Sequence, residues 1–487
     1  MGQSIDKTDF VAADYERFRA QLLEDLNEFR AILDRPGFGA GPASFGAEVE
    51  LYLVDQDAQV VHANEAIREA SGDPGLTLEL NRFNLEYNLE PVPARGSPFA
   101  SIEKTLQQTL LRLDRNAASC GAGIVPIGIL PTLTTSQLGP QAMTDLPRYH
   151  ALSDALRQRR GEDFAIHIKG AETLDLRWGD VTLEGANTSF QFHYRVEPAD
   201  FRDVWNTASL LTPLMTALAA NSPLLFGKRL WQETRIPLFE QSVDSRVAHT
   251  FRARLPPRVG FGNGWLREGI HELFVEGAYL FPPLMPVMPE TTAPGELSAM
   301  RLHQGSIWSW NRPIYDPADG GHVRIELRAL PAGPTCADMC ANAAIFVGLI
   351  EAMKPYINTI IPGLPFRYAA ENFYNAAHHG LDAIMLWPDI DSRTLRERTV
   401  VDILEELLPM VSGGLAGLDV ATSDISRAVS IAGDTLASGQ NGSRWLLGSL
   451  AKLTAAGTER SEALRVLVNE YRTRALSNTP VARWDIL

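Results

Sequence analysis

Apolar residues return every three or four positions in several long segments of the chain, the spacing that buries one face of a helix. Segments of this kind occupy residues 9–33, 101–120 and 198–220. From about Cys336 onward the same spacing dominates, with short Gly- and Ser-rich breaks between the periodic stretches. We therefore expect an N-terminal helix, two further long helices and a mostly helical C-terminal region.

A strict alternation of apolar and polar residues marks the segments between these helices, and this period of two is typical of a strand with one buried face. In residues 44–55, Glu48 and Glu50 fall on one side of the strand, while apolar residues fall on the other. Residues 76–92 repeat the alternation and carry three more acids, which are Glu79, Glu86 and Glu90. Both segments predict strands that pack on a core and turn acids toward a polar site.

Two later segments alternate in the same way with a different set of polar side chains. In residues 187–196, Gln191 and His193 share one face, and aromatic residues occupy the other. In residues 321–330 the polar face carries Arg324, Glu326 and Arg328. Strands separated by long helices, with the acidic strands far apart in sequence, predict an α+β fold built on a curved antiparallel sheet.

The composition is that of an ordinary globular protein, since 45% of the 487 residues are apolar and 21% are charged. The net charge of −15 argues against binding nucleic acid or an anionic membrane over a broad surface. The N-terminus is polar, and the longest apolar run, residues 341–353, is too short to cross a bilayer. We expect a cytoplasmic protein with no nucleic-acid or membrane partner; the sequence leaves open whether it forms a homo-oligomer.

Three cysteines in a chain of this length do not make a disulfide framework. Cys336 and Cys340 are four residues apart in a helical segment, so they share a helix face. We expect them to be buried as small apolar residues, with a redox or metal role as the alternative.

The acids on the predicted strands suggest a site for divalent cations. Burying many like-charged carboxylates together is costly unless cations compensate them, and Mg²⁺ prefers carboxylate and phosphate oxygens. Arg324 and Arg328 cannot bind a metal, but they are suited to a bidentate grip on phosphate or carboxylate. Carboxylates, Mg²⁺ and arginines together indicate nucleotide-dependent phosphoryl transfer.

The usual glycine-rich nucleotide motifs are missing. GxxxxGK[ST] does not occur, and the nearest string to GxGxxG, at residues 260–264, has neither its spacing nor its context. If ATP binds, we expect sheet carboxylates and arginines to hold it. The nucleophile elbow G-x-S-x-G is also absent, so no such motif points to a covalent enzyme intermediate.

Several strings, in this order, resemble the motifs of glutamate–cysteine ligase family 2 and its related carboxylate–amine ligases. They are GAEVEL (46–51), EYNLEP (86–91), GILPTL (128–133), LPRYHAL (146–152) with Arg148 and Tyr149, SFQFHYRV (189–196), a long segment (221–246) that ends in Ser245 and Arg246, and HVRIELRAL (322–330). The resemblance runs from about Phe45 to Pro334. The chain departs from the family pattern at Leu130, where a His is expected, and at Ala329 or Leu330, where an Asp is common. These departures concern the substrates more than the fold.

The resemblance implies a glutamine-synthetase-like fold whose concave sheet holds ATP, Mg²⁺ (or Mn²⁺) and substrates. We expect the chain to divide into an N-terminal helix that packs on the body (1–36), a catalytic domain of this fold (37–350) and a mostly helical C-terminal region (351–487). The resemblance also implies a reaction in which glutamate, or a similar acid, is phosphorylated by ATP and then joined to the amine of cysteine, a step of glutathione biosynthesis.

By position, the resemblance also implies roles for single residues. The implied metal ligands are Glu48, Glu50, Glu86, His193 and Glu326. The implied catalytic residues are Arg328 near the transferred phosphate, Glu326, and Arg246 on the substrate carboxylate. Arg324, Arg328 and Gln191 are the expected nucleotide-binding residues.

Three alternatives remain open at this point. The first keeps the chemistry but joins glutamate to another amine, since nothing in the sequence specifies a thiol pocket. The second is a ligase-like fold that serves as a non-catalytic binding subunit. The third is an unrelated fold whose polar strand faces are merely solvated, as exposed Glu residues usually are.

Overall fold

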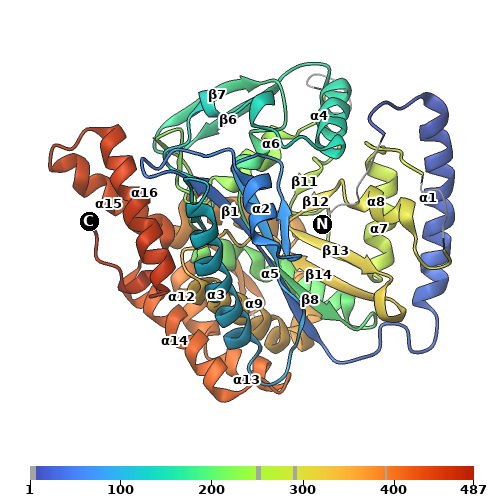
Figure 1. The fold of residues 1–487 in the computed structure, drawn as a ribbon. Coiled ribbons are helices and arrows are strands. Elements are labelled where there is room, and N and C mark those ends of the chain that lie inside the picture. Colours follow the sequence, from blue (N-terminus) through green and yellow to red (C-terminus); the bar gives the residue numbers. More distant parts are fainter. Residues whose placement is uncertain (1–6, 248–253, 289–292, 390–391) are drawn as a thin grey trace.

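An eight-stranded antiparallel sheet lies at the centre of the molecule, with helices against one face and at its sides (Figure 1). The computed structural model describes residues 7–247, 254–288, 293–389 and 392–487. The strands follow the order β13-β14-β8-β1-β3-β2, and β4 and β5 pair with the two ends of β1. Their bounds are β1 (Ser44–Val54), β2 (Leu76–Leu78), β3 (Asn84–Asn88), β4 (Val92–Pro93), β5 (Gly123–Val125), β8 (Phe190–Val196), β13 (Asn311–Asp316) and β14 (His322–Leu327).

The apolar side of the sheet is covered by three long helices, α3 (Pro98–Ala118), α5 (Phe201–Ala219) and α9 (Cys336–Met353). Phe45 of β1 stacks on Phe99 of α3 with ring centroids 5.2 Å apart, and Phe99 in turn stacks on Phe192 of β8. Because successive strand residues point to opposite faces, burying Phe45 and Phe192 against the helices turns Glu48, Gln191 and His193 to the other, concave side. The curved antiparallel sheet expected from the alternation is confirmed.

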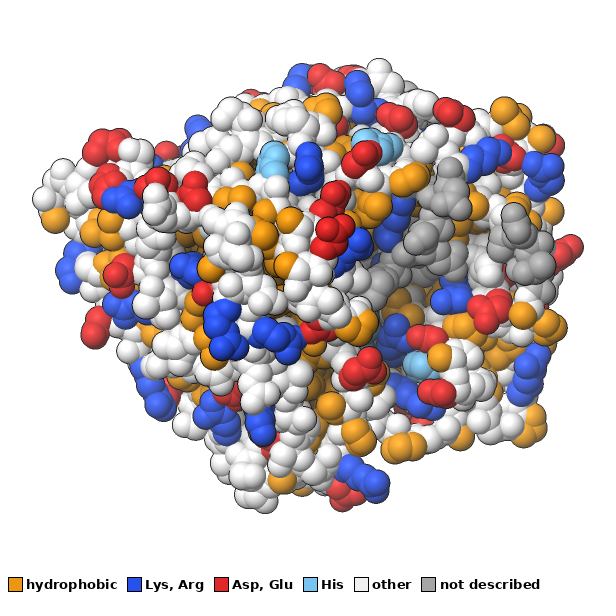
Figure 2. Space-filling model, in the orientation of Figure 1, with side chains coloured by type: hydrophobic (Ala, Val, Ile, Leu, Met, Phe, Trp, Pro, Cys, Tyr) orange, Lys and Arg blue, Asp and Glu red, His pale blue; other side chains and the backbone are white. Residues whose placement is uncertain are grey.

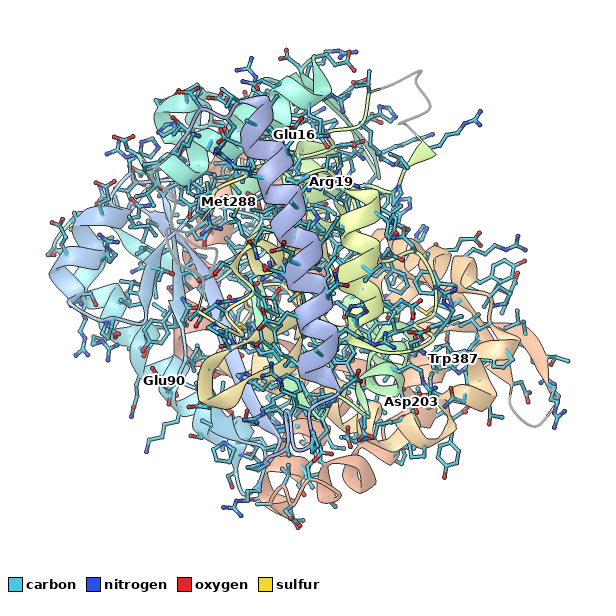
Figure 3. All side chains as sticks on the ribbon, turned by 90° about the vertical axis from the view of Figure 1, so that its right-hand side faces the viewer. Glu16, Arg19, Glu90, Asp203, Met288 and Trp387 are labelled. Atoms are coloured by element: carbon cyan, nitrogen blue, oxygen red, sulfur yellow. The ribbon has the colours of Figure 1, made fainter. Side chains whose placement is uncertain are left out.

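The acidic segment 76–92 forms three short strands instead of one continuous alternating strand. β2 and β3 pair as a hairpin, and the turn between them is anchored by the Asn84 amide on the Asn81 carbonyl. This turn places Glu79 beside the concave face. Glu90 lies beyond β3 and is exposed at the outside of the molecule (Figure 3).

The N-terminal helix α1 (Ala12–Leu33) packs against α7 (Ile270–Leu280) and α8 (Ser298–Gln304) on one side of the sheet (Figures 1 and 3). Phe29 anchors it, with its ring centroid 5.0 Å from those of Phe274 and Tyr315. These helices form one wall beside the concave face.

A second wall stands on the other side. It contains α4 (Pro147–Arg160), the hairpin of β6 (Phe164–Lys169) and β7 (Thr173–Trp178), and α6 (Arg235–Ser242), which packs on β6. The remaining small elements before α9 are α2 (Asn64–Ser71), β9 (Leu224–Leu225), β10 (Lys228–Arg229), β11 (Val259–Gly260) and β12 (Trp308–Ser309).

The chain after α9 is mostly helical, as expected, with one exposed hairpin inserted. Its elements are α10 (Ile357–Ile360), α11 (Phe366–His379), β15 (Ile384–Asp389), β16 (Thr394–Thr399), α12 (Val400–Leu407), α13 (Met410–Ala416), α14 (Thr422–Ser438), α15 (Gly442–Ala455) and α16 (Arg460–Ser477). The domain boundaries drawn from the sequence stay predictions.

One helical stretch, Cys336–Gly363, is longer than the apolar run seen in the sequence and has the length and hydropathy of a membrane span. However, 83% of its most apolar window is buried inside the structure. It is therefore placed as a core helix, between the sheet and the C-terminal helices. Cys336 and Cys340 lie buried on it, and burial raises the pKa of both thiols, which suits packing better than reactivity.

Candidate active site

Strand register brings the predicted polar residues together on the concave face. Glu326 of β14 lies opposite His193 of β8 and opposite Arg312 of β13. On the other side of β8, Glu48 pairs with Gln191, and Glu50 pairs with Glu86 of β3. Carboxylates separated by almost three hundred residues of sequence therefore share one surface.

These side chains line a cavity of about 570 Å³ between the two walls, a size typical of small-molecule sites. Figure 2 shows a hollow on this face of the molecule, with acidic and basic side chains gathered around it. The predicted residues that line the cavity are Glu48, Glu50, Glu86, Gln191, His193, Arg324, Glu326 and Arg328, and Glu79 joins them.

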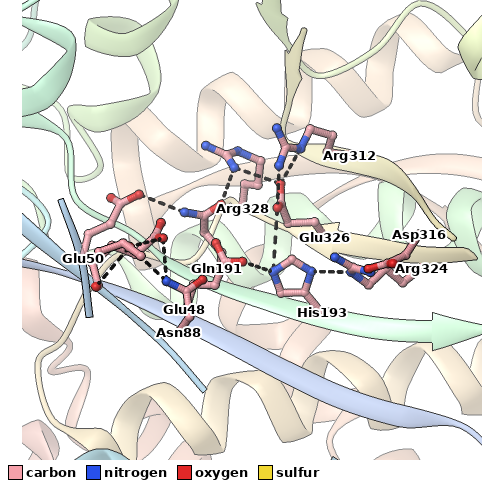
Figure 4. Close-up of polar contacts among 12 residues, drawn as sticks. Glu48, Glu50, Asn88, Gln191, His193, Arg312, Asp316, Arg324, Glu326 and Arg328 are labelled. Carbon is pink, nitrogen blue, oxygen red and sulfur yellow. Dashed lines mark hydrogen bonds and ion pairs between the residues drawn. The ribbon is translucent and has the colours of Figure 1, made fainter. Parts of the chain in front are cut away.

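Two carboxylates and one imidazole, those of Glu48, Glu326 and His193, have potential ligand atoms that all lie within 4.8 Å of one another (Figure 4). We call these three residues the first acid group. Burial opposes ionisation of Glu48, but the nearby His193 outweighs it and lowers the Glu48 pKa to about 2. The pKa of Glu326 is also held well below its usual range, because Arg312, Arg328 and His193 overcome the cost of burial.

Glu326 is the most tightly held of these acids, with its side chain only 1% exposed. Arg312 lies 2.7 Å from one of its oxygens and donates a hydrogen bond of 2.8 Å to the other, and Arg328 donates a second bond of 2.8 Å. Arg328 also donates to Gln191. Arg312 was not predicted from the sequence, although the alternation of residues 311–316 places it on the polar face of β13.

His193 has two different neighbours at its two ring nitrogens. Arg324, itself paired with Asp316 at 2.7 Å, donates a 3.1 Å hydrogen bond to Nδ1. Nε2 is buried, forms no hydrogen bond with the described residues, and lies 3.1 Å from Glu48 Oε1 and 3.7 Å from Glu326 Oε1. A buried ring nitrogen this close to two carboxylates fits a metal ligand. A neutral imidazole that binds a metal through Nε2 carries its proton on Nδ1. Nδ1 could then no longer accept the hydrogen bond from Arg324, so that bond would have to break.

A second acid group consists of Glu50, Glu79 and Glu86, again within 4.8 Å of one another. Burial, followed by repulsion between the carboxylates, raises the pKa of Glu50 and Glu86 to about 8 and that of Glu79 to about 7. Three carboxyl groups, one buried and two partly buried, that repel one another fit a divalent cation, which would relieve both costs at once. Glu79 therefore belongs in the candidate ligand set, and the exposed Glu90 does not.

Arg246 is the one predicted site residue that the structure does not bring to this cavity. Its guanidinium pairs with Asp244 through two bonds of 2.8 and 2.9 Å and donates to the Leu255 carbonyl at 3.1 Å. Its predicted role on a substrate carboxylate stays a prediction and requires Asp244 to release it. Among residues that the sequence missed, Glu184 also lines the cavity, from a 3₁₀ turn (Glu184–Ala186) that has no periodic signal.

A second cavity of about 510 Å³ lies on the far side of α6 and β12, and Gln304 and Pro313 line both cavities. The glycine-rich residues 260–264, which lack the dinucleotide-binding spacing, border this second cavity.

The fold is one found among ligases. A solved structure of glutamate–cysteine ligase from Francisella tularensis in complex with AMP aligns with a TM-score of 0.52 at 12% identity, covering 92% of each chain. A bifunctional glutathione synthetase from Pasteurella multocida aligns with a TM-score of 0.46 at 13% identity, covering 94% of this chain and 56% of that one. Among proteins of curated function, none matches this sequence.

The sequence itself gives the assignment. Residues 44–470 match the family model of glutamate–cysteine ligase family 2, so the chain belongs to this family. Its family and fold are those of enzymes that form carbon–nitrogen bonds.

Proposed function

We propose that the protein is an ATP- and Mg²⁺-dependent ligase that joins the γ-carboxylate of glutamate to an amine, with cysteine as the first candidate. One observation carries this proposal: two acid groups, buried or partly buried, and the arginines beside them face one cavity on the concave sheet. The match to the family and the AMP held by the Francisella tularensis ligase support nucleotide use.

The residues present fit divalent cations. Glu48, His193 and Glu326 would hold one, and Glu50, Glu79 and Glu86 would hold another. Bound there, Mg²⁺ would neutralise phosphate charge and lower the repulsion between the triphosphate and the substrate carboxylate.

In the first step, side chains of the protein position the substrates and supply positive charge to the phosphoryl group. A γ-carboxylate oxygen of glutamate attacks the γ-phosphorus of ATP, ADP leaves, and an acyl phosphate forms. Arg328 donates to Glu326 and Gln191 in the structure, and we assign its guanidinium to the transferred phosphoryl group. Arg324 and Gln191 complete the nucleotide-facing side of the cavity.

The second step consumes the acyl phosphate. The amine nitrogen attacks its carbonyl carbon, the bond from carbon to the phosphate oxygen breaks, and inorganic phosphate leaves. Starting from an ammonium group, two protons are lost: one ends on the phosphate and one is released to solvent. No covalent bond to the protein is needed.

The test is phosphate release from ATP with Mg²⁺ across a panel of acids and amines. We expect release that depends on glutamate and rises at least about tenfold with the correct amine, because the acyl phosphate is protected until it is attacked. Mass spectrometry of the amide identifies the product. Folded protein that releases no phosphate with any pair would refute the ligase and favour a binding subunit.

The cellular setting of this reaction is also proposed. We propose that the enzyme works in the cytoplasm on small-molecule substrates, and its net charge of −15 argues against a nucleic-acid or anionic-membrane partner.

A further inference from the structure

A small recess opens from the floor of the large cavity, beneath the second acid group. Its volume is about 30 Å³, room for one or two groups the size of a water molecule. Glu50, Glu79, Glu184 and Arg328 line both spaces. The recess is therefore an inner end of the candidate active site.

Acceptor oxygens dominate the lining of this recess. Three carboxylates, those of Glu50, Glu79 and Glu184, face it. The two guanidinium groups in the lining already have partners: Arg235 binds Glu233 at 2.7 Å and the Ala329 carbonyl at 2.8 Å, and Arg328 binds Glu326. The three carboxyl groups outnumber the two guanidinium groups, which are already engaged, so a bound cation would relieve the repulsion between the acids.

Two buried polar atoms of the recess point to a missing ligand. Asn84 is 2% exposed and its Nδ2 donates to the Leu51 carbonyl, but its Oδ1 makes no hydrogen bond with the described residues. Asn187 Oδ1, a second acceptor in the lining, is equally unpaired within the described chain, whereas the unpaired Trp310 Nε1 is a donor and needs an acceptor instead. An unsatisfied buried carbonyl oxygen costs stability, and a ligand that donates hydrogen bonds would remove this cost.

Size decides which cation fits. Mg²⁺ dehydrates reluctantly and usually keeps several of its waters, and a recess of about 30 Å³ cannot hold them. A primary ammonium group is about as large as a water molecule and donates three hydrogen bonds without needing octahedral geometry. Glu184 and Asn84 lie outside both acid groups proposed to hold metal, so they are available to an ammonium group.

We propose that this recess binds the ammonium group of the amine substrate, with Glu184 and Asn84 Oδ1 as its acceptors and Glu79 beside them. The inference rests on the proposed ligase function and specifies its second substrate: a primary amine whose remaining atoms extend into the large cavity. Glu184 is then a specificity-determining residue.

The experiment compares wild-type protein with Glu184→Gln, which keeps the shape of the side chain and removes its charge. Cysteine is the amine probe, and hydroxylamine, which is uncharged near neutral pH, traps the acyl phosphate as a hydroxamate. Losing a hydrogen bond to a charged group should raise the KM for cysteine about ten- to hundredfold, while the KM values for ATP and glutamate change less than about twofold. Hydroxamate formation should fall far less than amide formation.

Glu90→Gln is the matched control, because Glu90 is exposed and outside the cavity. An unchanged KM for cysteine in Glu184→Gln, or an equal rise in all three KM values, would overturn the inference and leave the ligase function standing. If the wild type makes neither amide nor hydroxamate, the proposed function fails instead.

Thallium(I), a monovalent cation close to ammonium in size, tests the recess without turnover. Crystals soaked in thallium acetate with Mg²⁺ should show anomalous density between Asn84 and Glu184 in the wild type and none in Glu184→Gln. Wild-type crystals without that density would contradict the proposal, whatever the kinetics show.

Discussion

Glu326→Gln is expected to lower the rate of amide synthesis by about a thousandfold or more, because one side chain serves both halves of the site. Glu326 belongs to the first acid group, and it also fixes Arg312 and Arg328 through three close contacts. The amide keeps the volume but removes the charge that both arginines need. Steady-state phosphate release with ATP, Mg²⁺, glutamate and the amine measures the loss.

The same substitution has a cost in stability that must be separated from the loss of turnover. Removing one partner of a buried ionic network typically destabilises by about 3–5 kcal/mol, so we expect a lower melting temperature but a folded protein at room temperature. Circular dichroism checks the fold. Glu90→Gln, an exposed Glu-to-Gln change, should leave both rate and melting temperature as in the wild type. A Glu326→Gln variant with near-normal rates would refute the assigned role.

The central strands could be predicted because burial on one face leaves a period of two in the sequence. The alternation around Glu48, His193 and Glu326 placed each of them on a polar face, and the observed register puts these faces side by side. A shift of one residue would have sent them into the core, so pattern and register had to agree. The pairing of these three strands is enough to bring the three side chains to one concave surface.

The other site residues were harder to predict, for a physical reason in each case. Glu79 lies in a hairpin turn and Glu184 in a 3₁₀ turn, where no periodicity ties a side chain to a face. Arg246 follows α6, and its direction is set by the ion pair with Asp244. Arg312 occupies an edge strand and became evident only once β13 was seen to pair with β14. Turn geometry and competing ion pairs are set by tertiary contacts that a single sequence does not encode locally.

The melting temperature of metal-free protein is expected to fall as the pH rises from about 4.5 to about 8, and Mg²⁺ should reverse this fall. Glu50, Glu79 and Glu86 have pKa values raised from 4.5 to about 8, 7 and 8, first by burial. Between these limits the unfolded chain has already lost protons that the folded chain still holds, so unfolding becomes more favourable as the pH rises. Below about pH 4.5 these groups are protonated in both the folded and the unfolded chain, so they no longer make stability depend on pH.

Mg²⁺ competes with protons for the same three carboxyl groups. The rise in melting temperature that it causes should therefore be small near about pH 5 and should grow to roughly 5 °C or more near about pH 8. Thermal denaturation at several pH values, with chelator or with saturating Mg²⁺, gives both curves. Glu86→Gln removes one of the three repelling charges without adding bulk, so its metal-free protein should depend less on pH and gain less from Mg²⁺. Glu90→Gln, which leaves the three acids untouched, should follow the wild type in both curves. A magnesium effect that is equal at all pH values would mean that the ion binds somewhere other than these raised carboxylates.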